Sequence, residues 1–427
     1  MNSDQEMDTS DRHDLMRAFA AMVGAERVRP PSENESRAAR IIIEPESSHE
    51  ISEIVRKCES EQLTLAPIGA ARTLAQIRRQ PTDVGLSLTR LDHILDYQPD
   101  DMTIVAEAGL TLGVLNDNTA SRGQRLPCDP QNPKMTTLGA LVGAAKCGPL
   151  RLSEGKVRDL LIGIEFVGHH GRLIHAGGRV VKNVTGYDLM KVMTGAFGTL
   201  GIVTQVIFKV RPVPENYSLA ITSFDDAADA LSAARRAEEA ANLSHLEVLS
   251  SSLGEKFDRP GRFMVLAGFA GSRKEADYYR AHVSNALRRN TLMLTGNDAT
   301  ASYQRLRDVD FADAALVAQL AVLPAELPRC LAECGAEFRA HAGSGVAQLF
   351  LERDRADHEI ADAVARWREI AHRCSGNLRV LAAHEEVRDK LEFFDQPPAP
   401  ALNLMRRLKL TFDPKNIFNP GCFIAGI

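Results

Sequence analysis

Few features of this sequence are typical of a protein that binds nucleic acid or spans a membrane. Its 51 Lys and Arg residues are fewer than its 56 Asp and Glu residues, the formal net charge is −5, and no basic run is interleaved with aromatic residues. No apolar run is long enough to span a bilayer, and residues 1–14 are acidic and polar, unlike a signal peptide. We therefore predict a cytoplasmic protein without nucleic-acid partners.

Cysteine is also sparse, and its spacing does not match the common metal and cluster motifs. The seven cysteines are an odd number and include no C-x-x-C pair. Cys330 and Cys334 lie one helical turn apart, but no neighbouring His or Cys completes a metal site. We expect free thiols in a reducing compartment, no metal site, and no iron–sulfur cluster on this chain.

The chain has 427 residues, of which 44% are hydrophobic, and this is enough for two or three domains. Residues 1–35 are predicted to form an N-terminal extension that is partly disordered. A short amphipathic helix in this extension would place Leu15, Phe19 and Met22 on one side.

The region that follows begins with a strand–helix–strand pattern. The compact apolar run at 41–43 predicts a buried strand, and Ser47 with Glu50 has the spacing of a helix capping box. A second strand is predicted at 63–68, ending at Gly69. This opening is typical of an α/β unit and not of an all-β domain.

Pro212 and Pro214 mark a change of pattern, after which predicted strands alternate with long alanine-rich helices. Strands are predicted at 218–222, 244–249, 263–269, 316–322, 345–351 and 378–382, and helices at 225–241, 273–288, 325–334 and 356–374. We interpret this half as an antiparallel sheet with helices on one face, which makes the overall fold class α+β.

Two glycine-rich stretches suggest a ligand site. The first, 136–167, is rich in small residues, and the second, 177–210, runs through a basic turn with Lys182 and Asn183 into a glycine turn and a strand with alternating apolar residues. Glycines let backbone amides approach a flat or phosphorylated cofactor closely. Each glycine alone would be explained equally well by close packing of a helix on a sheet.

Two stretches, Thr136–Val210 and Leu408–Phe423, resemble the FAD-binding subunits of bacterial glycolate oxidases. These belong to the superfamily with the vanillyl-alcohol-oxidase (PCMH) type of flavin domain. The resemblance is most specific in GGRVVKNVTGYDLMKVMTGAFGTLGIVTQV and LKLTFDPKNIFNPGCF. It implies a two-lobed FAD domain at 36–213, a cap domain at 214–400, and a C-terminal segment, 401–427, that returns to the FAD domain.

The resemblance also implies which residues contact a non-covalently bound FAD. The pyrophosphate loop would be Pro67, Gly69, Ala70, Ala71, Arg72 and Thr73; the second segment would contribute Pro127, Thr136, Thr137, Gly139, Gly143 and Gly148; and the third would contribute Gly198, Gly201, Ile202 and Val203.

The pyrophosphate loop departs from the glycine-rich pattern of the family. Ala70 and Ala71 would each disfavour a left-handed conformation by roughly 1–2 kcal/mol, and Arg72 would partly offset this by pairing with phosphate. The loop also lacks the histidine that holds flavin covalently in some relatives.

Candidates for catalysis are sparse. Competent 2-hydroxy-acid dehydrogenases of this superfamily carry a histidine cluster with a carboxylate on the cap, whereas here His341 is the nearest equivalent and His384 the second candidate. A single histidine in a strand is more often structural than catalytic, so the sequence leaves the catalytic residues unassigned.

The leading hypothesis is an FAD-binding subunit of a glycolate (2-hydroxy-acid) oxidase complex that is inactive alone. Its partners would be a sister FAD-containing catalytic subunit and an iron–sulfur subunit, at the inner face of the cell membrane. Two alternatives remain open: a scaffolding subunit that has lost FAD, and a self-sufficient FAD-dependent oxidase.

Overall fold

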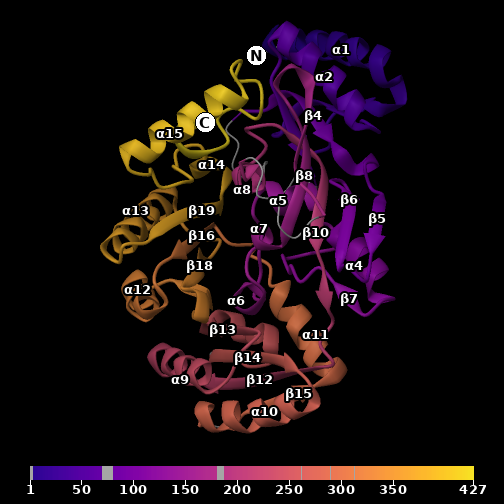
Figure 1. Cartoon of the computed structure of the whole chain (residues 1–427). Coiled ribbons are helices and arrows are strands. Elements are labelled where there is room, and N and C mark those ends of the chain that lie inside the picture. The colour runs from indigo at the N-terminus through magenta and orange to yellow at the C-terminus, as the bar shows by residue number, and fades with distance from the viewer. Residues whose placement is uncertain (1–2, 70–79, 180–186, 261, 289, 312) are drawn as a thin grey trace.

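A mixed four-stranded sheet forms the first lobe of the N-terminal domain (Figure 1). The computed structural model describes residues 3–69, 80–179, 187–260, 262–288, 290–311 and 313–427. In spatial order the strands are β1 (Val28–Arg29), β2 (Ala39–Ile43), β4 (Thr82–Ser87) and β3 (Leu65–Ile68), and the last three are parallel. Helix α2 (Ser48–Glu61) begins where the sequence predicts, because the Ser47 side chain accepts a hydrogen bond from Glu50 N at 3.1 Å.

The N-terminal segment packs on this lobe through helix α1 (Ser3–Val23) and β1. Phe19 is fully buried, and Val28 pairs with Ile43 of β2. Met22 is 39% exposed whereas Phe19 is fully buried, so the lobe covers only part of the apolar side of α1.

The second lobe is a five-stranded antiparallel sheet with β10 at its centre. In spatial order its strands are β5 (Ile94–Gln98), β6 (Thr103–Glu107), β10 (Ile202–Lys209), β8 (Leu161–Gly168) and β9 (Arg172–Gly177). The alternation predicted for β10 is confirmed, since Ile202, Val206 and Phe208 are fully buried. The helices of this lobe are α4 (Leu112–Ala120), α5 (Leu138–Gly143), α6 (Arg151–Glu154), α7 (Val157–Leu160) and α8 (Leu189–Met193), and β7 (Gln124–Arg125) pairs with β11 (Arg211–Pro212).

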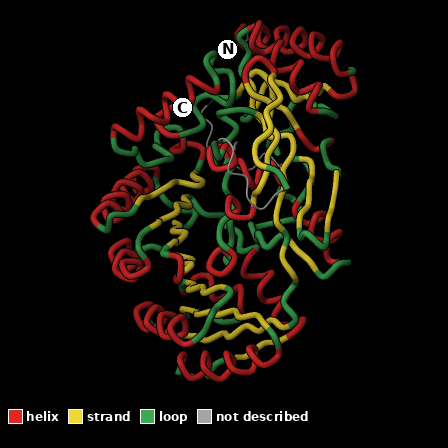
Figure 2. The backbone as a smooth tube through the Cα atoms, viewed as in Figure 1, coloured by secondary structure: helices red, strands yellow, loops and turns green. Residues whose placement is uncertain are grey.

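The cap contains one eight-stranded antiparallel sheet, which Figure 2 shows with helices along its outer side. Its spatial order is β15 (Leu292–Thr295), β12 (Asn216–Phe224), β14 (Phe263–Gly271), β13 (His245–Leu249), β17 (Glu337–His341), β18 (Val346–Leu351), β16 (Leu316–Ala321) and β19 (Asn377–Ala383). The outer helices are α9 (Ala227–Ala240), α10 (Arg273–Leu287), α12 (Leu327–Cys334) and α13 (Asp357–Arg373).

One helix departs from the expected arrangement with all helices on one face. Helix α11 (Gly296–Arg307) packs on the opposite face of the cap sheet, where Ala299 and Leu306 join the buried cluster that includes Leu219. Figure 1 shows α11 on the side that faces the N-terminal domain. Gln131 Nε2 donates to Val309 O at 3.0 Å, so the chain just after α11 is bonded to that domain.

The C-terminal segment lies against the first lobe. After the short helix α14 (Glu385–Arg388) and helix α15 (Ala399–Phe412), Ile417 O accepts a hydrogen bond from Leu65 N at 2.8 Å. Phe418 forms an isolated parallel bridge with the same β3 residue. Among the described residues, no helix is long and apolar enough to cross a membrane.

Candidate functional site

Three segments that the sequence singles out lie in contact with one another: the end of β3, the start of α5 and the turn before β10. A Cβ atom added to Gly69 would lie 3.0 Å from Thr137 Oγ1, and one added to Gly198 would lie 2.5 Å from Pro67 Cγ. These four residues mark a contact region that we call the cradle. The absence of a side chain at both glycines is what allows the three segments to approach so closely.

Backbone hydrogen bonds fix the cradle, and the C-terminal segment takes part. Phe197 N donates to Gly143 O at 2.8 Å, which ties the glycine turn to α5. Asn419 is fully buried; its Nδ2 donates to Phe197 O, and its backbone N donates to Leu65 O at 2.7 Å. Residues far apart in the sequence therefore complete one site.

The glycines around the cradle have different roles. A Cβ atom on Gly148 would lie 1.9 Å from Asp129 O, and one on Gly139 would lie 3.1 Å from Ala108 O, so close packing alone explains both. A Cβ atom on Gly143 would meet no described atom within 4 Å. Of these three glycines, Gly143 is the one with an unfilled face, since no described atom packs where its side chain would lie.

The predicted contacts at the start of β10 are packed into the sheet. A Cβ atom on Gly201 would lie 2.8 Å from Val167 O. The side chains of Ile202 and Val203 are 0% and 8% exposed, and both residues pair with β8. The structure thus places these three residues beside the cradle, but as part of the packed second lobe.

The remaining predicted cofactor residues are divided between buried and undescribed positions. Thr136 is buried and its hydroxyl donates to Asn132 O at 3.1 Å, and Pro127 is buried in the loop after β7. The rest of the predicted pyrophosphate loop and the basic turn lie outside the described residues: Ala70, Ala71, Arg72, Thr73, Lys182 and Asn183.

Arg379 of β19 extends from the cap toward the cradle. Its guanidinium carbon lies 5.2 Å from the ring centroid of Phe197 and 5.6 Å from that of Phe394. Its Nε is buried and has no hydrogen-bond partner in the part of the chain that the structure describes. An unfilled face at Gly143 and an unsatisfied cationic donor over the ring of Phe197, whose backbone N is bonded to Gly143 O, fit a flavin, which is flat and carries carbonyl acceptors.

A buried carboxylate connects the N-terminal domain to α11. Asp129 Oδ2 accepts hydrogen bonds from the Tyr303 hydroxyl and, at 2.8 Å, from Leu150 N. Burial raises the pKa of Asp129 to about 7, and these two donors only partly offset the effect. Asp129 is therefore a buried carboxyl group, with its pKa raised by burial, located where the two domains meet.

His341 has a carboxylate partner that the sequence did not reveal. Glu247, in the middle of β13, lies 2.5 Å from His341 Nδ1 through Oε1 and 3.0 Å from Arg339 Nε through Oε2. Burial alone would raise the pKa of Glu247, but its interactions with His341 and Arg339 outweigh that effect and lower the pKa. In the sequence, the available signal was the position of Glu247 between apolar residues of a predicted strand, because a charged residue that is buried there needs a charged partner.

A buried histidine, His245, lies on the same strand as Glu247. His245 Nε2 is 2.8 Å from the Tyr217 hydroxyl, and its ring centroid is 5.0 Å from that of Tyr303. Burial lowers the pKa of His245 to about 4, so the imidazole is neutral at physiological pH. Together with Asp129 and Glu247, these residues form the buried polar network between the cap sheet and the N-terminal domain.

His384 lies elsewhere, immediately before α14. The first turn of that helix carries Glu385 and Glu386. This is the solvated helix start that the sequence favours over a catalytic role.

Comparisons with known proteins match both halves of the chain. A family model described as FAD binding domain matches residues 39–177, and a model described as FAD linked oxidases, C-terminal domain, matches residues 213–422. The chain is 32% identical over 188 residues to glycolate oxidase subunit GlcD of Bacillus subtilis, covering 43% of this chain and 40% of that protein. It is 33% identical over 174 residues to glycolate oxidase subunit GlcE of Escherichia coli, covering 38% of this chain and 50% of that protein.

These two matches thus span half or less of each glycolate oxidase subunit. A longer match, 25% identical over 418 residues, covers 89% of this chain and 90% of a D-lactate dehydrogenase of Archaeoglobus fulgidus. Among solved structures, p-cresol methylhydroxylase with substrate bound superposes with a TM-score of 0.71, 17% identity and 96% coverage of both chains. At that identity the likeness shows the fold, which is the two-lobed flavin domain with a cap.

Proposed function

Because the chain belongs to the FAD-linked oxidoreductases with a PCMH-type FAD-binding domain, we propose that it is the FAD-binding subunit of an oxidase complex for a small 2-hydroxy acid such as glycolate. The observation that carries this proposal is the cradle, where β3, α5, the glycine turn and Asn419 converge on an unfilled face at Gly143. Bound FAD supplies the acceptor for the hydride of the substrate.

The chain's own residues would hold the flavin and position charge beside it. Gly143 leaves room for the ring, and Arg379 offers a donor toward its carbonyl groups. Glu247 accepts at His341 Nδ1 and so orients the other ring nitrogen, Nε2, as a proton acceptor. The side chains of His341, Glu247 and Arg339 are only 12%, 1% and 5% exposed, so this group is enclosed by the cap and the N-terminal domain.

FAD binding is tested with graded substitutions at Gly143. Gly143→Ala and Gly143→Phe put increasing volume into the unfilled face, so we expect FAD affinity to fall in that order. Gly143→Ala should stabilise the flavin-free protein slightly, by about 0.4–1 kcal/mol, because alanine restricts the unfolded chain at a helical position.

Flavin is measured in the supernatant after denaturation and by titration of FAD into stripped protein, and thermal unfolding of the stripped variants is the control for folding. Wild-type protein that neither contains nor takes up FAD supports the scaffolding alternative. Affinity that does not depend on the size of residue 143 means that FAD lies elsewhere.

Catalysis and partners are tested together. Dye reduction with glycolate and D-lactate is measured for the chain alone and with the flavoprotein and iron–sulfur subunits captured from its own cell. We expect low activity alone and a large increase in the complex. Substantial turnover by the chain alone that His341→Ala abolishes would favour the self-sufficient oxidase, and so would the absence of captured partners.

A further inference from the structure

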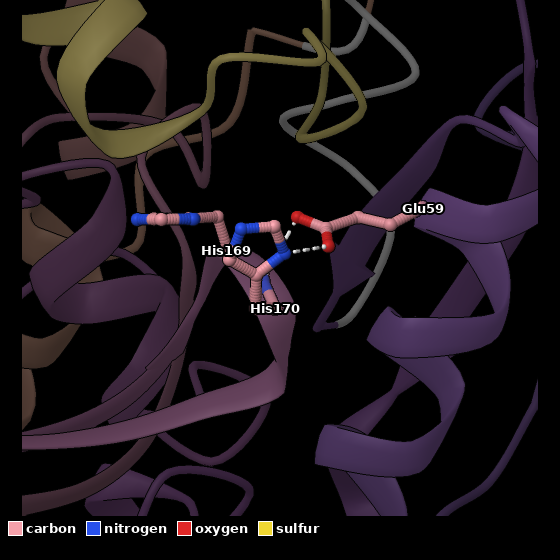
Figure 3. A group of neighbouring side chains, drawn as sticks. All are labelled: Glu59, His169 and His170. Atoms are coloured by element: carbon pink, nitrogen blue, oxygen red, sulfur yellow. Dashed lines mark hydrogen bonds and ion pairs between the residues drawn. The ribbon is translucent and has the colours of Figure 1, made fainter.

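A carboxylate and two adjacent imidazoles meet at the C-terminal end of α2, outside the cradle. Glu59 lies in the last turn of α2, and His169 and His170 form the turn between β8 and β9. Figure 3 shows the Glu59 side chain pointing from its helix toward that turn. One ligand atom from each residue lies within 4.8 Å of the other two, and no second group of this kind occurs among the described residues.

The turn is held in an unusual conformation. His170 has a φ of 58°, in the left-handed region that residues with a side chain rarely adopt. Its backbone N donates to Glu59 Oε1 and its Nδ1 lies 2.8 Å from Oε2, so Glu59 fixes both the backbone and the ring. The centroids of the two imidazole rings are 4.6 Å apart, in an edge-to-face arrangement.

Hydrogen bonding accounts for His170 but not for His169. The Nδ1 atom of His169 is buried and has no hydrogen-bond partner in the part of the chain that the structure describes. Buried polar atoms in native proteins are nearly always bonded, so this atom requires another partner. Glu59 is 4% exposed, unlike the solvated acidic groups that commonly gather on protein surfaces.

We propose that Glu59, His169 and His170 bind one divalent transition-metal ion of the Zn²⁺ class. Two imidazoles and one carboxylate are a ligand set that zinc uses, with a water molecule in the fourth position. A surface hollow of about 330 Å³, lined by Glu59, His170 and Lys415, leaves room for that water. Imidazole ligands favour Zn²⁺, Ni²⁺ or Cu²⁺ over Mg²⁺ and Ca²⁺, which prefer oxygen ligands.

Two cationic side chains line the same hollow, and both are held by other groups. Lys415 Nζ donates to the backbone carbonyl of Glu59 at 2.9 Å, and Arg56 Nε donates to that of His170 at 3.2 Å. Arg56 also pairs with Glu53. A bound cation would gain from the C-terminal end of α2, where the helix dipole is negative.

The proposal is tested by titrating Zn²⁺ into the tag-free, FAD-loaded chain in a calorimeter. We expect one ion per chain, no comparable binding of Mg²⁺, and a loss of affinity of roughly 10–100-fold or more in His169→Ala and His170→Ala. His93→Ala is the matched control, because His93 Nδ1 forms a similar pair with Glu107 Oε2 at 2.9 Å without a second imidazole. Its Zn²⁺ affinity should equal that of the wild type.

X-ray absorption at the zinc edge gives a second measurement on the loaded protein. Two imidazole ligands are expected in the wild type and one in His169→Ala. His169 donates no hydrogen bond to Glu59, so this variant decides the question even where His170→Ala fails to fold. Absence of stoichiometric Zn²⁺ uptake by the wild type, or uptake that His169→Ala leaves unchanged, would overturn the proposal.

Discussion

Replacing Lys409 with methionine should destabilise the protein strongly, because this lysine is buried at the junction of the C-terminal segment and the cradle. Lys409 Nζ donates to Asp413 Oδ2 at 2.6 Å, to Phe418 O at 2.8 Å and to Thr199 O at 2.9 Å. Lys409 is 7% exposed and Asp413 is 2% exposed. Burial lowers the pKa of Lys409, and the charge of Asp413 offsets this only in part.

The expected loss in free energy of unfolding follows from the buried charge of Asp413, which the substitution leaves without a cationic partner. Methionine occupies a similar volume, so little cavity forms, but Asp413 keeps its buried charge with only Ile417 N at 3.0 Å and Phe418 N at 2.8 Å as donors. Removing one partner of a buried ion pair costs about 3–5 kcal/mol. Because Thr199 lies in the glycine turn, we also expect FAD affinity to fall.

The assay is urea unfolding followed by circular dichroism and by flavin release. Arg407→Met is the matched control, since Arg407 is an exposed residue of the same helix, and it should change stability by less than about 0.5 kcal/mol. Lys409→Met/Asp413→Asn should recover part of the loss, because the uncompensated charge is gone. A cost of under about 1 kcal/mol for Lys409→Met alone would refute the reasoning.

Three further predictions concern the buried polar network. Folding raises the pKa of Asp129 from 3.8 to about 7, so the free energy of unfolding of the wild type falls as pH rises through that range. In urea unfolding at several pH values, the stability of Asp129→Asn relative to the wild type should therefore rise with pH up to about pH 7 and stay constant above it. Gly268→Ala puts a Cβ atom 2.1 Å from His245 Nε2 and should cost about 1–3 kcal/mol in urea unfolding through overpacking. Glu247→Gln leaves Arg339 without its counter-charge and should lower the free energy of unfolding by about 3–5 kcal/mol at neutral pH. Because folding lowers the pKa of Glu247, this difference in unfolding free energy from the wild type should shrink as pH falls through that lowered pKa.

Local signals in the sequence predicted helix α2 and strand β10 of the N-terminal domain, but not helix α5, which carries part of the cradle. The cap of α2 at Ser47 and the alternation along β10 depend on residues within a few positions of each other, so a single stretch contains the whole signal. The return of the C-terminal segment was also predicted, although from the family resemblance and not from its residues. The α+β class followed from the pattern of strands and helices and is confirmed by the sheets of the structure, whereas the cofactor followed from that resemblance and is confirmed by the family models.

The parts that sequence analysis missed depend on distant partners or weak local signals. Strand β15 is short and partly exposed, and α11 buries only a small apolar face of Ala299 and Leu306. Neither segment therefore shows a clear periodicity of hydrophobic residues in the sequence. The partner of His341 is on another strand, and adjacency of β13 and β17 is a property of the sheet order. Spacing along the chain cannot reveal such pairs.

The crossing of the C-terminal segment onto β3 has a consequence for biosynthesis. The N-terminal domain is predicted to end near residue 213, yet Leu65 receives its backbone partners from Ile417 and Asn419. At typical translation rates of roughly 5–20 residues per second, the ribosome needs on the order of 10–40 s to make the intervening cap. During that interval one edge of β3 is unpaired and the proposed flavin site lacks Asn419. We therefore expect the first lobe to be completed, and flavin to be bound, only after the cap has been synthesised.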